Sequence, residues 1–151
     1  MNSEQDCKSI RRQAIIMFSH DFAGVVGILG GCSHCLNSIA TKESSYDNND
    51  ISELLEIAKD HQQHSESTFT AMIDYMKSSL ENCVTELSVI IEQMNTVYQD
   101  DLKSWYVYLT QLEIHYLETS ELDIELTNLL IHHAGNLTNF RIKLQDELIK
   151  L

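Results

Sequence analysis

The chain has 151 residues, a formal net charge of -13 and a hydrophobic fraction of 43%. That length permits one substantial core, or a helical hairpin with a small second domain, and it excludes two large domains. The acidic charge argues against a nucleic-acid partner, because Arg11 and Arg12 form the only basic cluster.

A long helix is predicted over residues 5–40. Apolar side chains recur there in four-three spacing, which is typical of a buried helical seam. The seam consists of Ile15, Phe18, Phe22, Val25, Leu29, Cys32, Leu36 and Ile39. His20 falls on the opposite, outward side, and Gly24, Gly27 and Gly31 share that outer face.

The glycines of this helix demand an explanation. Four of the five glycines in the chain lie at 24, 27, 30 and 31, and each costs a helix about 0.8–1 kcal/mol relative to alanine. An exposed imidazole with the Asp21 carboxylate beside it suits phosphoryl transfer, and the glycines would let a partner backbone approach. The alternative is a surface histidine beside a glycine-rich bend or a close helix crossing.

A second helix is predicted over residues 51–80, after a polar loop at 41–50. Two long helices with a short connection form an antiparallel hairpin. One hairpin has too little core by itself, so two copies should pair into a four-helix bundle, which makes a homodimer the expected state. Residues 1–81 are therefore predicted to be a dimerisation and phosphoacceptor domain, and the fold class is mainly α.

Residues 82–151 are predicted to form a small α/β domain. A helix over 84–98 precedes runs of β-branched and aromatic residues that are typical of strands. The later elements expected are strands at Trp105–Leu109 and Leu112–Leu117, a helix at Glu121–His133 ended by Gly135, and a strand through Phe140–Leu144. Residues 102–133 can also be drawn as helices, which would favour a plain four-helix monomer.

The string Phe18-Ser19-His20-Asp21-Phe22 resembles the H-box of sensor histidine kinases, in which the phosphoacceptor His precedes an acidic residue. The longer run through Gly27 is similar to the ChpT-type histidine phosphotransferases, whose motif reads approximately His-Asp-Leu-x-x-Pro-Val-Gly. His20, Asp21, Val26 and Gly27 agree with that motif. Phe22 replaces its leucine, and Val25 replaces its proline.

Leu126 to Thr138 resembles a degenerate N-box of the kinase ATP-binding domain. Leu129 and His133 stand where that motif has asparagines, one of which coordinates the nucleotide's metal. The resemblance therefore implies a degenerate, truncated ATP-binding-like domain and no autokinase activity.

The expected function is a histidine phosphotransferase of a phosphorelay, which accepts a phosphoryl group on His20 from a receiver-domain aspartate and passes it to another receiver. Its catalytic residues are His20 and Asp21, and Gly24, Gly27, Gly31, Phe22 and Ala23 are expected to dock the partner. The partners implied are response-regulator receivers and a hybrid histidine kinase. No cofactor is expected on this chain, because the receiver would supply the Mg²⁺.

Two alternatives stay open. The chain could be a non-catalytic, pseudokinase-like adaptor that docks two-component signalling partners, since docking needs the glycines but not the imidazole. A zinc site is the other, because Cys32 and Cys35 form a C-x-x-C pair and His61 and His64 lie one turn apart on the second helix.

A cytoplasmic location is expected, without membrane association. The longest uncharged apolar run, Phe22 to Cys35, is too short and glycine-rich to span a bilayer, and the first twenty residues show no signal-peptide pattern. A chain with a substantial hydrophobic core needs no disulfides to fold, so Cys7, Cys32, Cys35 and Cys83 are expected to be reduced thiols.

Overall fold

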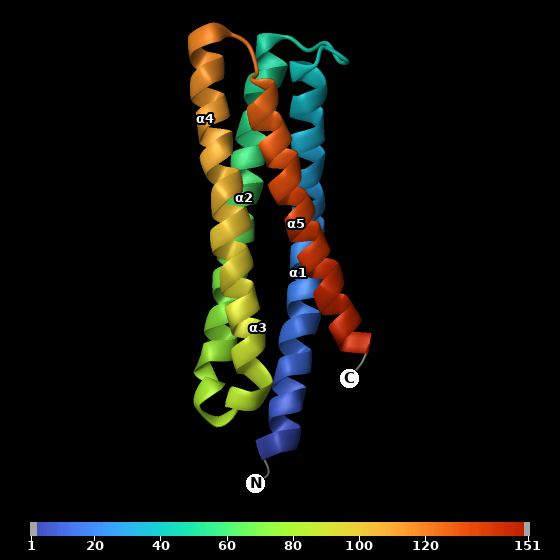
Figure 1. Cartoon of the computed structure of the whole chain (residues 1–151), viewed down its shortest axis with the longest axis vertical. Coiled ribbons are helices and arrows are strands. Elements are labelled where there is room, and N and C mark those ends of the chain that lie inside the picture. The colour runs from blue at the N-terminus through green and yellow to red at the C-terminus, as the bar shows by residue number, and fades with distance from the viewer. Residues whose placement is uncertain (1–2, 150–151) are drawn as a thin grey trace.

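A computed structural model describes the backbone of residues 3–149 and the side-chain surroundings of residues 6–147. Four long helical segments of this part of the chain form an elongated bundle, and consecutive segments run in opposite directions (Figure 1). The elements are α1 (Ser3–Ala40), α2 (Asn48–Ser78), the 3-10 turn η1 (Leu80–Asn82), α3 (Val84–Val97), the π-helical turn η2 (Tyr98–Leu102), α4 (Lys103–Thr119) and α5 (Ile124–Ile149). The segments α3, η2 and α4 follow one another without a gap and form one long helical segment.

Aspartates mark where two of the long helices begin. The Asp47 carboxylate accepts a hydrogen bond from the Asp50 backbone N–H at 2.8 Å at the start of α2. The Asp123 carboxylate accepts from the Leu126 N–H at 2.9 Å at the start of α5. Each bond satisfies one of the free N–H groups of a first helical turn, so these acids define the helix starts.

The core is centred on α1, which packs against both α2 and α5. The Phe18 ring lies 5.0 Å from that of Phe69 on α2 and 6.0 Å from that of Phe140 on α5, and the Phe22 ring lies 4.7 Å from that of Phe69. Trp105 on α4 is fully buried and donates its indole N–H to the Ser33 hydroxyl of α1 at 2.9 Å. These contacts join all four segments in one hydrophobic core.

The predicted helical hairpin is confirmed. Residues 5–40 lie within α1, and its seam side chains are buried from Ile15 through Leu36, with Ile39 half-buried. The polar residues in the middle of α2 are accommodated locally. The buried Ser65 hydroxyl donates to the His61 carbonyl at 2.8 Å, and Gln62 donates to Glu66 at 3.3 Å.

The predicted strands are wrong. The segments 105–109 and 112–117 lie within α4, 140–144 lies within α5, and residues 3–149 contain no strand. Trp105, Leu109, Leu112 and Tyr116 are the buried residues of α4, and their spacing of four, three and four is the helical period. Packing of that face overrides the strand preference of the aromatic and β-branched side chains between them.

The residues assigned to an α/β domain instead complete the bundle. Helix α5 packs along α1, and α4 packs against α5. The homodimer was predicted because one hairpin has too little core, and that reason no longer holds, since α3, α4 and α5 of the same chain cover the hairpin. The arrangement is that of the plain four-helix alternative.

Two of the four cysteines form a disulfide, which corrects the expectation of four thiols. The sulfur atoms of Cys7 and Cys83 are 1.99 Å apart, and their Cα atoms are separated by 5.4 Å. Cys32 and Cys35 are free. The cross-link joins the first turns of α1 to the start of α3, so it holds the amino-terminal end of α1 on the bundle.

Reduction of this disulfide is expected to lower the free energy of unfolding by about 2–4 kcal/mol, because the bond closes a long loop in the unfolded chain. Its two cysteines are 76 residues apart in sequence. Urea unfolding with and without a reductant measures the difference, and Cys7→Ser/Cys83→Ser should no longer respond to the reductant. An unfolding midpoint that reductant leaves unchanged in the parent protein would contradict the expectation.

Candidate functional site

His20 lies on the outward face of α1, on the side opposite the buried Phe18 and Phe22. Its side chain is 87% exposed, and that of Asp21 is 53% exposed. The His20 Nδ1 atom lies 3.1 Å from the Asp21 Oδ1 atom. The imidazole is therefore open to a partner while a neighbouring carboxylate contacts one of its nitrogens.

The contact with Asp21 distinguishes the two imidazole nitrogens. An ionised carboxylate can only accept a hydrogen bond, so Nδ1 must carry the proton that points to Asp21 in the neutral ring. The lone pair of a neutral imidazole then lies on Nε2, at the far side of the ring. This arrangement presents a nucleophilic nitrogen to an incoming electrophile.

The glycines of the outer face are not required by the packing of this chain. Gly24, Gly27 and Gly31 are exposed, and Gly30 is half-buried. A Cβ atom added at any of these positions would meet nothing within 4 Å, and α1 continues through all four without a break. Within this chain the glycines therefore serve neither a helix break nor a close helix crossing, and they leave a smooth open surface beside His20.

One residue that was expected to dock the partner does not lie on the outer face of α1, and two exposed residues of that face were not predicted. Phe22 is 0% exposed and belongs to the core, so it cannot contact a partner; Ala23 is half-buried. Ile16 and Ile28 are exposed to 37% and 38% and lie four residues before and eight residues after His20. Apolar residues outside the seam were the signal that would have identified them.

The outer face of α1 is almost free of charge, although the chain as a whole is strongly acidic. From residue 13 to residue 41, Asp21 is the only Asp, Glu, Lys or Arg. By length and composition alone, the stretch Asp6–Ala40 could cross a membrane, but in this structure it is a core helix of the bundle. An uncharged surface of short side chains with isoleucines at its edges is suited to contact with another protein.

The four residues of the zinc alternative are not brought together as a metal site. Within the described residues no three His, Cys, Asp or Glu side chains gather where they could hold an ion. Cys32 is buried in the seam, and burial, followed by the nearby Cys35, raises the pKa of its thiol. A raised pKa disfavours the thiolate that a metal or a nucleophilic reaction needs.

A second polar cluster surrounds the π-helical turn η2. Asp101 Oδ1 lies 2.9 Å from His133 Nδ1 and accepts a hydrogen bond from the Asn136 amide at 2.8 Å. On the other side, the Tyr98 hydroxyl donates to Glu66 at 2.6 Å. These contacts tie η2 to α5 and to α2, and they give His133, which stands at an asparagine position of the N-box resemblance, a structural role.

Tyr98 gives this cluster a measurable pH dependence. Burial, then the hydrogen bond to Glu66 and its charge, raise the pKa of the Tyr98 phenol from 10.0 to about 12. Since the pKa is higher in the folded state, the stabilisation is complete below pH 10 and is lost as the pH rises towards 12. Absorbance titration of the tyrosinates should show one late residue that Tyr98→Phe removes, and its absence would contradict the assignment.

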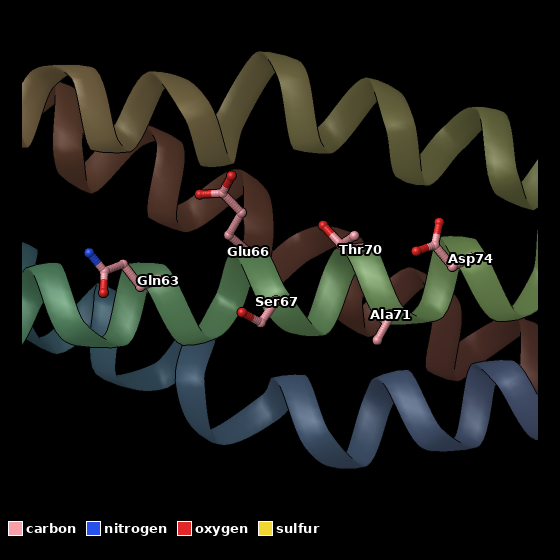
Figure 2. A pocket seen from close by; sticks show the side chains of 6 residues that line it. All are labelled: Gln63, Glu66, Ser67, Thr70, Ala71 and Asp74. Atoms are coloured by element: carbon pink, nitrogen blue, oxygen red, sulfur yellow. The ribbon is translucent and has the colours of Figure 1, made fainter.

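The site at His20 is an open surface, because the imidazole is 87% exposed. A shallow concavity on the outer side of α2 lies elsewhere (Figure 2), and no predicted site residue lines it. Its lining residues are Gln63, Glu66, Ser67, Thr70, Ala71 and Asp74. No cleft therefore surrounds the imidazole, and a reaction there would need a partner that brings its own pocket.

Comparison with known proteins does not assign a function. No protein-family model, curated protein or solved structure matches this chain. The geometry around His20 and the short motif that contains it therefore carry the functional argument.

Proposed function

We propose that the chain is a histidine phosphotransferase of a phosphorelay, which carries a phosphoryl group on His20 between receiver-domain aspartates without using a nucleotide. The observation that carries the proposal is an imidazole 87% exposed, 3.1 Å from a carboxylate, on a face whose glycines the fold does not need. The resemblance of Ser19 to Gly27 to the phosphotransferase motif supports the same reaction.

The chemistry requires little from this chain beyond a positioned nucleophile. The Nε2 lone pair of His20 attacks the phosphorus of an aspartyl phosphate, the N–P bond forms, and the bond from phosphorus to the aspartyl oxygen breaks. The aspartate leaves as a carboxylate, while the Nδ1 proton stays directed at Asp21. The step reverses when a second receiver offers an unphosphorylated aspartate.

The open surface fits the needs of such a partner. A receiver would supply the Mg²⁺ and the acidic pocket that neutralise the phosphoryl charge, so no metal need reside on this chain. Its loops must come close enough to align the phosphorus with Nε2, since positioning supplies most of the rate in phosphoryl transfer. Gly24, Gly27 and Gly31 allow that approach, and Ile16 and Ile28 would pack against apolar side chains of the receiver.

The proposal includes a hybrid histidine kinase as the source of the phosphoryl group and the cytoplasm as the location. The Cys7–Cys83 disulfide is unusual for the cytosol, which keeps thiols reduced, so a cytoplasmic location requires that the bundle also folds when this bond is reduced. A non-catalytic adaptor would use the same docking surface and would differ in leaving His20 unmodified.

A direct test incubates the purified protein with ATP alone and, separately, with a panel of phosphorylated receiver domains. Acid-labile phosphate is expected only in the receiver reactions, because the segments assigned to an ATP-binding-like domain form bundle helices instead. Receiver binding without transfer of phosphate would favour the adaptor. Labelling by ATP alone would contradict the proposal that no nucleotide is used.

A further inference from the structure

Helix α4 leaves an apolar stripe on its outer face. Val107, Ile114 and Leu117 are exposed to 48%, 52% and 74%, and Tyr106 beside them is 37% exposed. The opposite face of the same helix supplies the fully buried Trp105 to the core. A helix that buries one face and exposes large aliphatic side chains along the other is suited to a second helix.

We propose that this stripe binds the same stripe on a second copy of the chain, with the two α4 helices antiparallel about a two-fold axis. The charged residues at the two ends of the stripe indicate that the partner is a second copy of the chain and that the two α4 helices are antiparallel. Lys103 lies four residues before Val107, and Glu118 lies four residues after Ile114, both on exposed positions. If Val107 faces Ile114 of the second copy, Lys103 faces Glu118 of that copy, and the symmetry repeats both contacts.

The parallel arrangement is disfavoured by the same residues. It would place Lys103 opposite its own copy and Glu118 opposite its own copy, so both ends of the stripe would repel. The Lys103 ammonium lies 5.4 Å from the centre of the half-buried Tyr98 ring. Antiparallel pairing is the arrangement that satisfies the apolar centre and both charges.

This dimer would leave the phosphotransfer surface free. Helix α4 packs on α5 and α2, whereas His20 lies on the outer face of α1. The proposed α4–α4 dimer therefore differs from a dimer built through the α1–α2 hairpin. One helix from each copy makes a small interface, so the association should be weak and reversible.

Sedimentation equilibrium over a range of protein concentrations tests the interface. The parent protein should show a monomer–dimer equilibrium, and Ile114→Asp should abolish it while the helical circular dichroism stays unchanged. Ile142→Asp is the matched control, because Ile142 is a 43% exposed isoleucine on α5, away from the stripe. That variant should dimerise like the parent.

Charge reversal tests the register. Lys103→Glu or Glu118→Lys alone should weaken the dimer about tenfold, because each change puts like charges at both ends of the interface. The double variant Lys103→Glu/Glu118→Lys should restore parent affinity. The proposal is overturned if the parent is monomeric at every concentration up to about 1 mM, if Ile142→Asp dissociates the dimer as Ile114→Asp does, or if the double reversal fails to restore it.

Discussion

His20→Gln is expected to abolish phosphoryl transfer completely, because glutamine offers no nucleophilic nitrogen at the position of Nε2. The His20 side chain is 87% exposed, so its replacement should change the free energy of unfolding by less than about 0.5 kcal/mol. The measurement is the amount of acid-labile phosphate taken from a phosphorylated receiver that labels the parent protein. Binding of that receiver should be unchanged.

His34→Gln is the matched control for this experiment, since His34 is another exposed histidine of α1 and has no role in the proposed reaction. It should accept phosphate at the parent rate. If His20→Gln kept full transfer, the phosphoacceptor would lie elsewhere and the proposed function would be lost. If neither variant nor the parent accepted phosphate while all three bound the receiver, the adaptor would be the better account.

Gly27→Leu is expected to slow transfer by about 100-fold, because a leucine on the open face would hold the receiver away from His20, and a displacement of about 1 Å has that effect. The fold should tolerate the change. No atom lies within 4 Å of a Cβ placed at Gly27, and both alanine and leucine are better helix formers than glycine. Gly27→Ala should raise the free energy of unfolding by about 0.8–1 kcal/mol.

Gly135 supplies the control for the glycine experiment. It lies in the middle of α5, is exposed, and has equally open surroundings, so Gly135→Leu should stabilise the helix without slowing transfer. Stopped-flow or quenched-flow transfer rates and urea unfolding measure the two effects separately. A Gly27→Leu variant that is stable and transfers at the parent rate would show that the glycines do not serve docking.

The period of buried residues explains what could be predicted of the fold. In α1 the seam is unbroken over seven turns, so helix and buried face follow directly from it. In α4 the buried set of Trp105, Leu109, Leu112 and Tyr116 has the same period, but exposed Tyr106, Val107 and Ile114 fill the intervening positions. Because of those extra apolar residues, the helical period is not apparent in the sequence, and the segment resembles a strand.

Features that depend on pairing between distant segments could not be predicted. The disulfide between Cys7 and Cys83 and the contact between Asp101 and His133 require knowledge of which helices are neighbours. The burial of Phe22, by contrast, followed from its seam position, and that position already conflicted with the docking role expected of it. The outward position of His20 required only the spacing along one helix, which is why it could be predicted.

A time-resolved transfer experiment shows whether His20 carries the phosphoryl group from one receiver to another. A receiver carrying labelled phosphate is mixed with the protein and a second receiver, and the label on all three chains is followed, with mass spectrometry to locate it. We expect the label to leave the first receiver, to rise and fall on His20, and then to accumulate on the second receiver. Label that reaches the second receiver without passing through His20, or never leaves the first, would contradict this expectation.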